Sequence, residues 1–129
     1  AAVPNYNLET GLHEEHNRRE LMKDSTDLRL SHEMFYEDVC YFDKVASRQV
    51  ELLNSENIGV RVDYPDFTSL GVWQAKDAPF LCIEPWCGSA DFDDCSGVFA
   101  EKRGIEILAP GVEKTFTYAI TAVEHKAKV

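Results

Sequence analysis

Short runs in which apolar and polar side chains alternate recur along the sequence, and this period of two restricts the fold more than any other feature. Ile58 to Tyr64 alternates strictly between the two kinds of residue, and Pro65 follows the run. Thr115 to Thr121 has the same period and follows a turn signal at residues 109–111. A period of two places successive side chains on opposite faces of a strand. The pattern predicts antiparallel strands with one buried and one solvated face.

Other short runs also have the composition of strands, and they lie at residues 27–31, 39–42, 49–53, 69–74, 79–84 and 105–108. Gly, Pro, Asn and Asp separate these runs at short intervals, which is typical of antiparallel sandwiches and barrels. The fold class predicted is therefore all-β, with an antiparallel β-sandwich and little helix.

Two segments interrupt the alternation. Residues 14–24 are rich in charge, and we interpret residues 1–24 as an irregular lead-in whose charged part is a solvated loop or a short exposed helix. Residues 89–104 contain few β-formers and are predicted to form a long surface connection. The three aspartates at 91, 93 and 94 lack the spacing and the final Glu of a calcium-binding EF-hand, so a solvated loop is the better interpretation.

Length and charge limit the classes of function. A chain of 129 residues with 44% hydrophobic content has enough apolar material for one domain with a core. Its formal net charge of -10 argues against binding to nucleic acid or to an anionic membrane, and favours a small ligand. The first residues have no basic region followed by an apolar one, so we expect no export and a cytoplasmic location. Because the chain begins without Met, its amino terminus is either processed or truncated.

The four cysteines, Cys40, Cys82, Cys87 and Cys95, do not have the paired spacing of a structural zinc site. Cys40 and Cys82 lie in apolar runs, where a reduced thiol behaves as a small hydrophobe. We therefore expect free thiols, no metal and no cofactor. A bridge between Cys87 and Cys95 is the alternative for that pair.

Glu84 is the strongest candidate for chemistry. Alternation places it on the same strand face as Phe80 and Cys82, with Pro85 expected to end the strand and Trp86 beside it. A carboxylate that points into partly buried space is a candidate general base. The structural alternative is a glutamate at a strand end that reaches solvent or pairs with Lys or Arg.

Three longer motifs resemble one family. They are Leu30–Val39, Tyr64–Trp73 and Ala78–Asp91, and the last is the most specific. Together with residues 101–111 they resemble the aldose 1-epimerase (galactose mutarotase-like) proteins, in the branch with LacX-type and hexose-phosphate mutarotase-like members. The resemblance covers roughly residues 25 to 122.

This resemblance implies a large antiparallel β-sandwich and cofactor-free exchange of the α and β anomers of a hexose or hexose phosphate. It implies that Glu84 takes the proton from the anomeric hydroxyl and that Asp38, after Phe35-Tyr36-Glu37, binds sugar hydroxyls. Without the resemblance, Asp38 would be interpreted as a turn residue. Trp73 and Trp86 are candidates for an apolar platform under the sugar, with core packing as the alternative.

One departure from the family matters for catalysis. Family members are longer, and the half that precedes the matched region carries the histidine expected to act as the acid and an arginine that contacts the sugar. The nearest match to the histidine motif is Gly11-Leu12-His13-Glu14-Glu15-His16, which lacks the expected Pro and Phe, so neither His13 nor His16 is assigned as the acid. Scattered cations leave open whether the sugar is phosphorylated.

Two explanations account for the length. We favour a chain that is the carboxyl-terminal part of a longer epimerase, and the other explanation is a free-standing half-sandwich that needs a partner such as a second copy. The competing function is a carbohydrate-binding or interaction module without catalysis, and a β-rich structural subunit is a third class. An imidazole that lies across a pocket from Glu84 would favour the enzyme.

Overall fold

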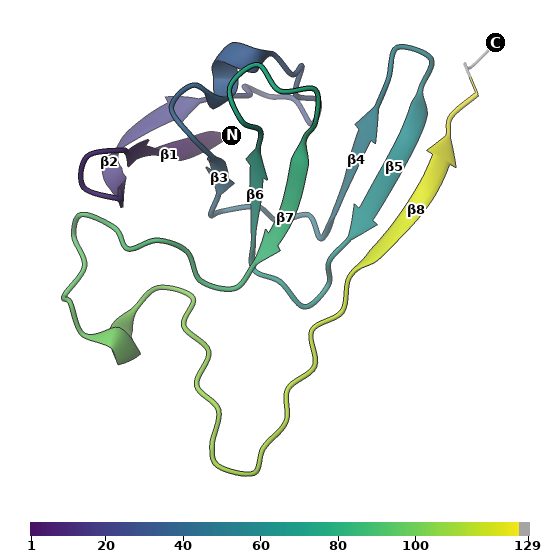
Figure 1. Ribbon diagram of the computed structural model, residues 1–129. Coiled ribbons are helices and arrows are strands. Elements are labelled where there is room, and N and C mark those ends of the chain that lie inside the picture. Colours follow the sequence, from purple (N-terminus) through teal and green to yellow (C-terminus); the bar gives the residue numbers. More distant parts are fainter. Residues whose placement is uncertain (127–129) are drawn as a thin grey trace.

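The computed structural model describes residues 1–126, and in these residues the chain is all-β with antiparallel sheets (Figure 1). The strands are β1 (Ala2–Asn7), β2 (Leu12–Glu20), β3 (Cys40–Phe42), β4 (Gln49–Leu53), β5 (Ile58–Asp63), β6 (Ser69–Trp73), β7 (Cys82–Trp86) and β8 (Ala119–Glu124). Two short 3-10 turns, η1 (His32–Phe35) and η2 (Phe99–Glu101), are the helical elements of the described part. The fold class and the low helical content predicted from the sequence are confirmed.

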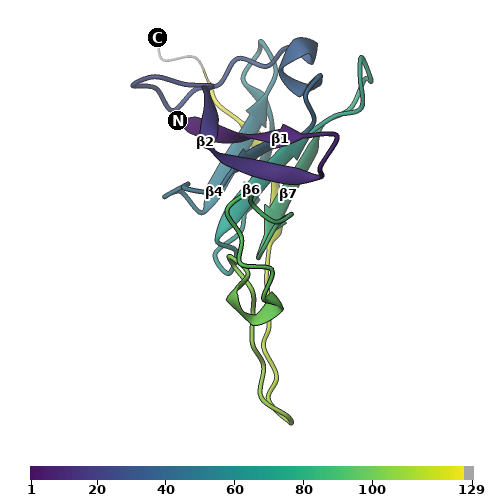
Figure 2. The same ribbon diagram turned by 90° about the vertical axis from the view of Figure 1, so that its left-hand side faces the viewer.

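The strands form three sheets, with the orders β1-β2, β3-β6-β7 and β4-β5-β8. Every pairing between these strands is antiparallel. Figure 1 shows the β3-β6-β7 sheet between the other two, and Figure 2 shows the β1-β2 hairpin crossing it. The central sheet therefore has a neighbour on either side, and this arrangement positions the candidate site.

The β1-β2 hairpin corrects the prediction of an irregular lead-in over residues 1–24. Charged side chains on β2 find partners far along the sequence: Arg18 Nη2 lies 2.6 Å from Asp43 Oδ2, and Glu15 Oε2 lies 2.6 Å from Arg103 Nη1. Val3 on β1 is 1% exposed and belongs to the main core. The charge of this segment thus reflects paired strand residues, and the hairpin is packed onto the rest of the molecule.

The central sheet buries one face in the main core. Register pairs Cys40 with Val72 and Phe42 with Leu70, and all four side chains are buried. Tyr64, 0% exposed, and Val62 of β5 join the same cluster. The core therefore lies between the central sheet and the β4-β5-β8 sheet.

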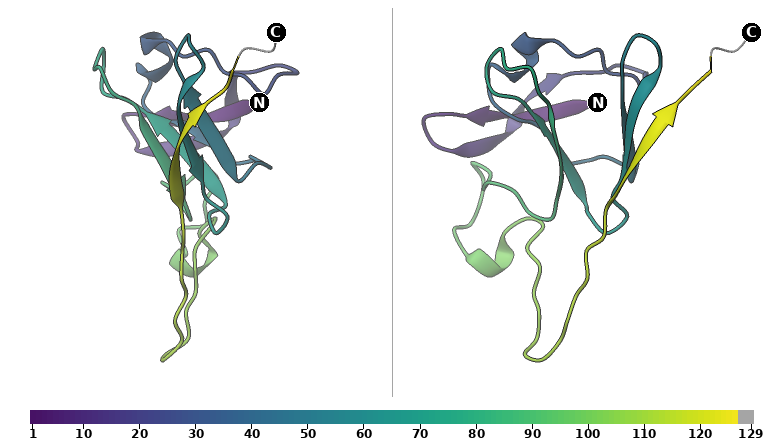
Figure 3. Two further views of the ribbon diagram at one scale, coloured as in Figure 1. Left: turned by 90° about the vertical axis from the view of Figure 1, so that its right-hand side faces the viewer. Right: turned by 45° about the vertical axis from the view of Figure 1, so that its right-hand side comes forward.

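A long connection leads from β7 to β8. Residues 105–118 extend away from the sheets as an arm whose two legs run side by side (Figure 3). The strand predicted at residues 105–108 is wrong, and the strand predicted at 115–121 begins only at Ala119. Large apolar side chains on the arm and β8 are exposed, among them Ile107, Leu108, Val112, Tyr118 and Ile120.

Three other boundaries differ from the sequence-based expectations. Residues 27–31 form no strand, and β7 starts at Cys82 instead of residue 79. Pro85 does not end β7, because it lies within the strand opposite Leu70. In the sheet order, β7 is an edge strand, where a residue that lacks an N–H is tolerated. No helix in residues 1–126 has the length and apolar character needed to cross a membrane.

Candidate functional site

The second face of the central sheet carries the candidate site. Register places Tyr41, Gly71 and Glu84 side by side in one row across β3, β6 and β7. Trp73 and Trp86 lie on the same face, because each is two residues from a member of that row. The alternation predicted for Cys82 and Glu84 is therefore confirmed, and the carboxylate projects from the middle of the edge strand β7.

Glu84 is held by its neighbour on the strand. The indole nitrogen Nε1 of Trp86 donates a hydrogen bond to Glu84 Oε2 at 3.1 Å. Glu84 takes part in none of the ion pairs between described residues. The structural alternative in which Glu84 pairs with Lys or Arg is therefore not seen in residues 1–126. One carboxylate oxygen is thus oriented by a neutral donor, and no cation of residues 1–126 forms an ion pair with the group.

Gly71 makes room for the Trp86 ring. A Cβ atom at Gly71 would lie 2.9 Å from Trp86 Cζ2 and 3.4 Å from Glu84 Oε2. The first distance is shorter than carbon atoms tolerate, so only glycine lets the indole lie against β6 here. The ring centroid of Trp86 is 5.3 Å from that of Tyr41, which limits the ring from the other side.

Asp38 approaches the same face from the segment between η1 and β3. Its φ of 73° is in the left-handed region, which Asp tolerates better than most residues. The backbone N–H of Val39 donates to Asp38 Oδ1 at 2.7 Å, and the N–H of Asp38 donates to the carbonyl of Phe35 at 3.2 Å. Asp38 is therefore a turn residue, as interpreted without the resemblance, and its binding of sugar hydroxyls stays a prediction.

A pocket of about 200 Å³ brings the candidate residues together, and its lining residues are Tyr6, His13, Asp38, Val39, Trp73, Glu84, Trp86 and Ala90. All four residues named from the sequence, Glu84, Asp38, Trp73 and Trp86, are in this set. Their roles remain predictions, but their convergence on one cavity is a finding. The set contains two carboxylates and neither Lys nor Arg.

His13 is the site residue that sequence reasoning missed. It lies on β2, is 1% exposed, and stacks on Tyr41 with ring centroids 4.7 Å apart and planes at 22°. Tyr6 and Phe92 enclose the ring, with centroids 5.3 Å and 5.1 Å from that of His13. Within the described residues neither ring nitrogen has a hydrogen-bond partner. A buried polar ring without a partner is unusual, and here it lines the pocket that holds Glu84.

Burial also determines the charge of His13. Desolvation lowers the pKa of His13 below its ordinary value of 6.5, and Arg18 contributes in the same direction. Asp43 and Asp38 act against this shift because negative charge favours the imidazolium. The neutral imidazole is therefore the main form at neutral pH, with one nitrogen as donor and the other as acceptor.

A signal for His13 is present in the sequence. Gly11 has a φ of 72° and sits at the turn between β1 and β2, where a glycine between two candidate strands indicates a hairpin. A hairpin would have given His13 a strand position with an inward face. The high charge of the residues that follow led instead to the interpretation of a solvated loop or a short exposed helix.

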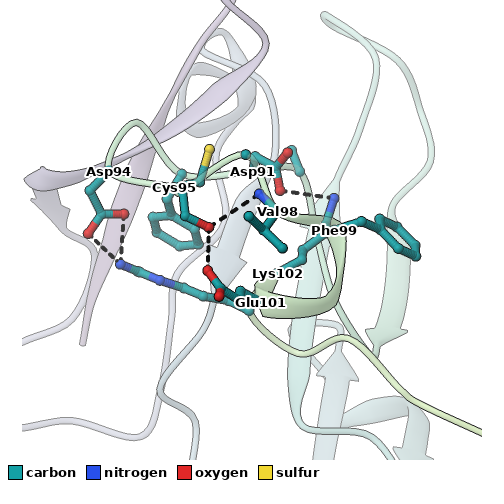
Figure 4. A pocket seen from close by; sticks show the side chains of 12 residues that line it. Asp91, Asp94, Cys95, Val98, Phe99, Glu101 and Lys102 are labelled. Carbon is teal, nitrogen blue, oxygen red and sulfur yellow. Dashed lines mark hydrogen bonds and ion pairs between the residues drawn. The ribbon is translucent and has the colours of Figure 1, made fainter.

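A second hollow of about 320 Å³ lies in the connection after β7 (Figure 4). Its charged side chains are largely paired with one another: Arg103 Nη2 contacts both oxygens of Asp94 at 2.8 and 2.7 Å, and Lys102 Nζ lies 3.2 Å from Asp91 Oδ1. Ser96 donates to Glu101 at 2.7 Å. Two of the three aspartates, Asp91 and Asp94, are therefore held in ion pairs within the loop, and Asp93 accepts from the backbone N–H of Glu15, in agreement with the surface connection predicted for it.

The four cysteines are free thiols. Burial is the main cause that raises the pKa of Cys40 and of Cys82 above the ordinary thiol value, which keeps both protonated. The alternative bridge between Cys87 and Cys95 is not formed, and Cys87 donates instead to the carbonyl of Asp66 at 3.6 Å. Within residues 1–126, no three side chains of His, Cys, Asp or Glu converge as metal ligands would.

The fold and the pocket define an all-β protein with an acidic, aromatic cavity on one face of a three-stranded sheet. Two curated proteins of Lactococcus lactis subsp. lactis are similar to this chain, namely Protein LacX, chromosomal, and Protein LacX, plasmid. Each is 28% identical over 122 residues, which are 93% of this chain and 41% of the relative. The chain therefore spans about two fifths of the length of these relatives.

The other comparisons found no match. No protein-family model matches the chain, and no solved structure is similar to it. The expected likeness to LacX-type proteins is confirmed as a distant similarity. The branch and the carboxyl-terminal placement remain predictions.

Proposed function

We propose that this chain carries the catalytic glutamate of a cofactor-free sugar mutarotase, an aldose 1-epimerase that exchanges the α and β anomers of a hexose. The observation that supports the proposal is the convergence of Glu84, Asp38 and His13 on one pocket. Anomer exchange needs a base and an acid on opposite sides of the anomeric centre. A carboxylate and an imidazole are the side chains suited to those roles.

In the proposed reaction, Glu84 takes the proton of the hydroxyl at C1 while the bond between C1 and the ring oxygen breaks. The protonated form of His13 gives its proton to the ring oxygen, and the open-chain aldehyde results. Rotation about the C1–C2 bond presents the other face of the aldehyde. On closure, His13 takes the proton of the attacking hydroxyl and Glu84 returns its proton to the aldehyde oxygen, so no proton is gained or lost.

The remaining lining residues would bind the sugar. Asp38 is an acceptor-only carboxylate and suits hydroxyl donors. Trp73 and Trp86 offer apolar ring surface to the C–H face of a pyranose. A cavity of about 200 Å³ is smaller than the roughly 300–1,000 Å³ typical of sites for drug-sized ligands, which suits a monosaccharide.

The charge of the lining favours a hexose over a hexose phosphate. The two carboxylates and the neutral His13 provide no cation for a phosphate, and the formal net charge of the chain is -10. Like charges at short range oppose binding of a phosphate dianion. Because the chain spans about two fifths of its relatives, we also propose that further chain, from a longer polypeptide or a second copy, borders a site whose acid and base both come from this chain.

A sugar-binding module without catalysis is the second candidate, and one observation favours it. His13 is 1% exposed and its lowered pKa keeps most of the imidazole without the proton that an acid must supply. In that case Asp38, Glu84 and His13 would hydrogen-bond sugar hydroxyls and the ring would stay closed.

The test is saturation-transfer NMR of α/β exchange in galactose, glucose and glucose 6-phosphate, with the unmutated chain, Glu84→Gln and Glu56→Gln. We expect the unmutated chain to accelerate exchange of the free hexoses and Glu84→Gln to lose about 10²- to 10⁴-fold of it, the usual contribution of a general base. Glu56 is exposed and outside the pocket, so its variant is the matched control and should keep full activity.

Two results would contradict the mutarotase. Binding of hexose without exchange would support the sugar-binding module instead. Undiminished exchange in Glu84→Gln would show that Glu84 is not the base. Saturable exchange of glucose 6-phosphate at a rate equal to that of glucose would contradict the preference for a free hexose.

A further inference from the structure

We propose that Arg103 is a positioning residue that holds His13 at the pocket by fastening the loop of residues 88–104 onto β2. This inference rests on the role proposed for His13 in anomer exchange. Arg103 lies outside the set of residues that line the pocket, so it acts through the side chains that enclose His13.

The loop of residues 88–104 is closed at its base. A Cβ atom at Gly104 would lie 2.7 Å from the backbone nitrogen of Gly88 and 2.9 Å from its Cα. Both glycines have positive φ, 79° at Gly88 and 71° at Gly104. Such close ends are typical of compact Ω-loops, which are packed by their own side chains.

The backbone of this loop binds that of His13. The N–H of His13 donates to the carbonyl of Asp91, and the N–H of Asp93 donates to the carbonyl of His13, both at 2.8 Å. These bonds form an isolated parallel bridge between His13 and Phe92. Because the loop also supplies Ala90 to the pocket wall, its position decides both the enclosure of His13 and the shape of the cavity.

Asp93 Oδ1 accepts from the backbone N–H of Glu15 at 3.1 Å, and a second side-chain contact between the loop and β2 comes from Arg103. Its guanidinium contacts Asp94 through two bonds at 2.8 and 2.7 Å and reaches across to Glu15 Oε2 at 2.6 Å. Forked contacts of this kind fix geometry as well as charge. The hydrogen bond from Arg103 is the main cause that lowers the pKa of Glu15, so the pair is ionised at neutral pH.

The same guanidinium covers the ring that encloses the imidazole. Arg103 Cζ lies 4.1 Å from the centroid of Phe92, a cation–π contact. Phe92 is 3% exposed and its centroid is 5.1 Å from that of His13. Arg103, Phe92 and His13 thus form a stack from the loop surface to the pocket, and loss of the outer member would let Phe92 move and water reach the imidazole.

Arg103 is separable from the hairpin's other ion pairs. Arg18 also contacts Glu15 Oε2, at 3.3 Å, and bonds Asp43 at 2.6 Å. With Arg18 in place, Glu15 stays anchored when Arg103 is replaced. A change at Arg103 therefore loosens the loop while it leaves β2 paired with β1.

The test compares Arg103→Gln and Arg103→Lys with Arg61→Gln, an arginine of β5 whose ion pair with Asp63 lies within its own strand. NMR titration of labelled histidine follows the imidazole of His13, identified by its loss in His13→Gln. Arg18 on β2 itself, and Asp43, Asp38 and Glu84 on neighbouring parts of the chain, are the charged groups near this ring, and they stay unchanged in each variant.

We expect the pKa of His13 to rise toward its ordinary value of 6.5 in Arg103→Gln, because hydration favours the charged form. The pKa of His13 should rise less in Arg103→Lys, since the lysine ammonium keeps the positive charge but cannot make the bidentate contact of a guanidinium. Arg61→Gln should titrate like the unmutated chain. In the exchange assay, kcat should fall in Arg103→Gln while KM stays within about twofold.

An unchanged His13 titration in both Arg103 variants would overturn the proposal, as would an equal rise in Arg61→Gln. If neither the unmutated chain nor any variant exchanges anomers but the His13 titration shifts as expected, the proposed mutarotase activity is contradicted. The positioning of His13 by Arg103 is supported in that case. If Arg103→Gln does not fold, Arg103→Lys alone decides by the same titration.

Discussion

The two faces of the β3-β6-β7 sheet are built from the same three strands and serve different ends. One face carries the buried Cys40, Phe42, Leu70 and Val72 and belongs to the main core. The other carries the row of Tyr41, Gly71 and Glu84 and borders the pocket. Because side chains alternate, each residue can be assigned to stability or to the site by its position alone. The comparison teaches that the two properties should respond to different substitutions.

The largest expected effect lies on the core face. Leu70 is 4% exposed, and Leu70→Ala should lower the free energy of unfolding by about 2–5 kcal/mol, through lost burial and the cavity left behind. Urea unfolding followed by fluorescence measures it. The remaining folded molecules should exchange anomers at the rate of the unmutated chain. If Leu70→Ala lowers the exchange rate per folded molecule along with the free energy of unfolding, the two faces are not separable.

A smaller effect is expected from Gly71→Ala on the site face. The added methyl group meets the Trp86 ring at 2.9 Å, so the indole must move and its hydrogen bond to Glu84 is lost. Overpacking of this kind costs about 1–3 kcal/mol in stability. The rate of anomer exchange per folded molecule should fall, beyond any loss that the lower stability explains. Val72→Ala on the opposite face is the control. Full exchange in Gly71→Ala would contradict the positioning of Glu84 by Trp86.

The smallest effect concerns acid. The pKa of His13 is lowered by folding, so below pH 6.5 the unfolded chain binds a proton that the folded chain resists. The stabilisation from His13 is therefore fully present above pH 6.5 and is lost as the pH falls through the lower, folded value. His13→Gln should reduce the acid dependence of the urea midpoint, while Leu70→Ala should leave that dependence unchanged. The same acid dependence in His13→Gln would show that other groups cause it.

The alternation rule accounts for what could be predicted from the sequence. It placed Glu84 on the face opposite Ile83, while strand composition predicted the bounds of β4, Gln49–Leu53. It failed where side chains have long-range partners. On β2, Glu15 pairs with Arg103 and Arg18 pairs with Asp43, and local sequence contains no record of either long-range pairing.

The site was predictable in part for the same reason. Glu84, Trp73 and Trp86 lie on two paired strands, so their convergence follows from the sheet. Asp38 was identified from a motif. His13 reaches the pocket because a hairpin crosses the sheet and the distant loop that contains Phe92 covers it, and neither contact follows from a local pattern.

For the arm, the sequence-based prediction was wrong in the opposite direction, because it placed strands that the structure does not form. Residues 105–108 and 115–118 have the composition of strands, yet they do not pair with a neighbouring strand in the structure. Composition reports the capacity to form a strand, while a strand also needs a partner for its backbone groups. Sequence patterns therefore predicted a sheet where the described residues offer no second edge.

The fit between Gly71 and Trp86 has a consequence for how such sequences can diverge. Neither residue can change first without cost, because any side chain at 71 strikes the indole and any smaller ring at 86 leaves a void above the glycine. The two positions should therefore change together, with a larger residue at one accompanied by a smaller ring at the other. An alignment of relatives would reveal this as covariation across two adjacent strands, and chains that break the rule should also have given up the carboxylate at position 84.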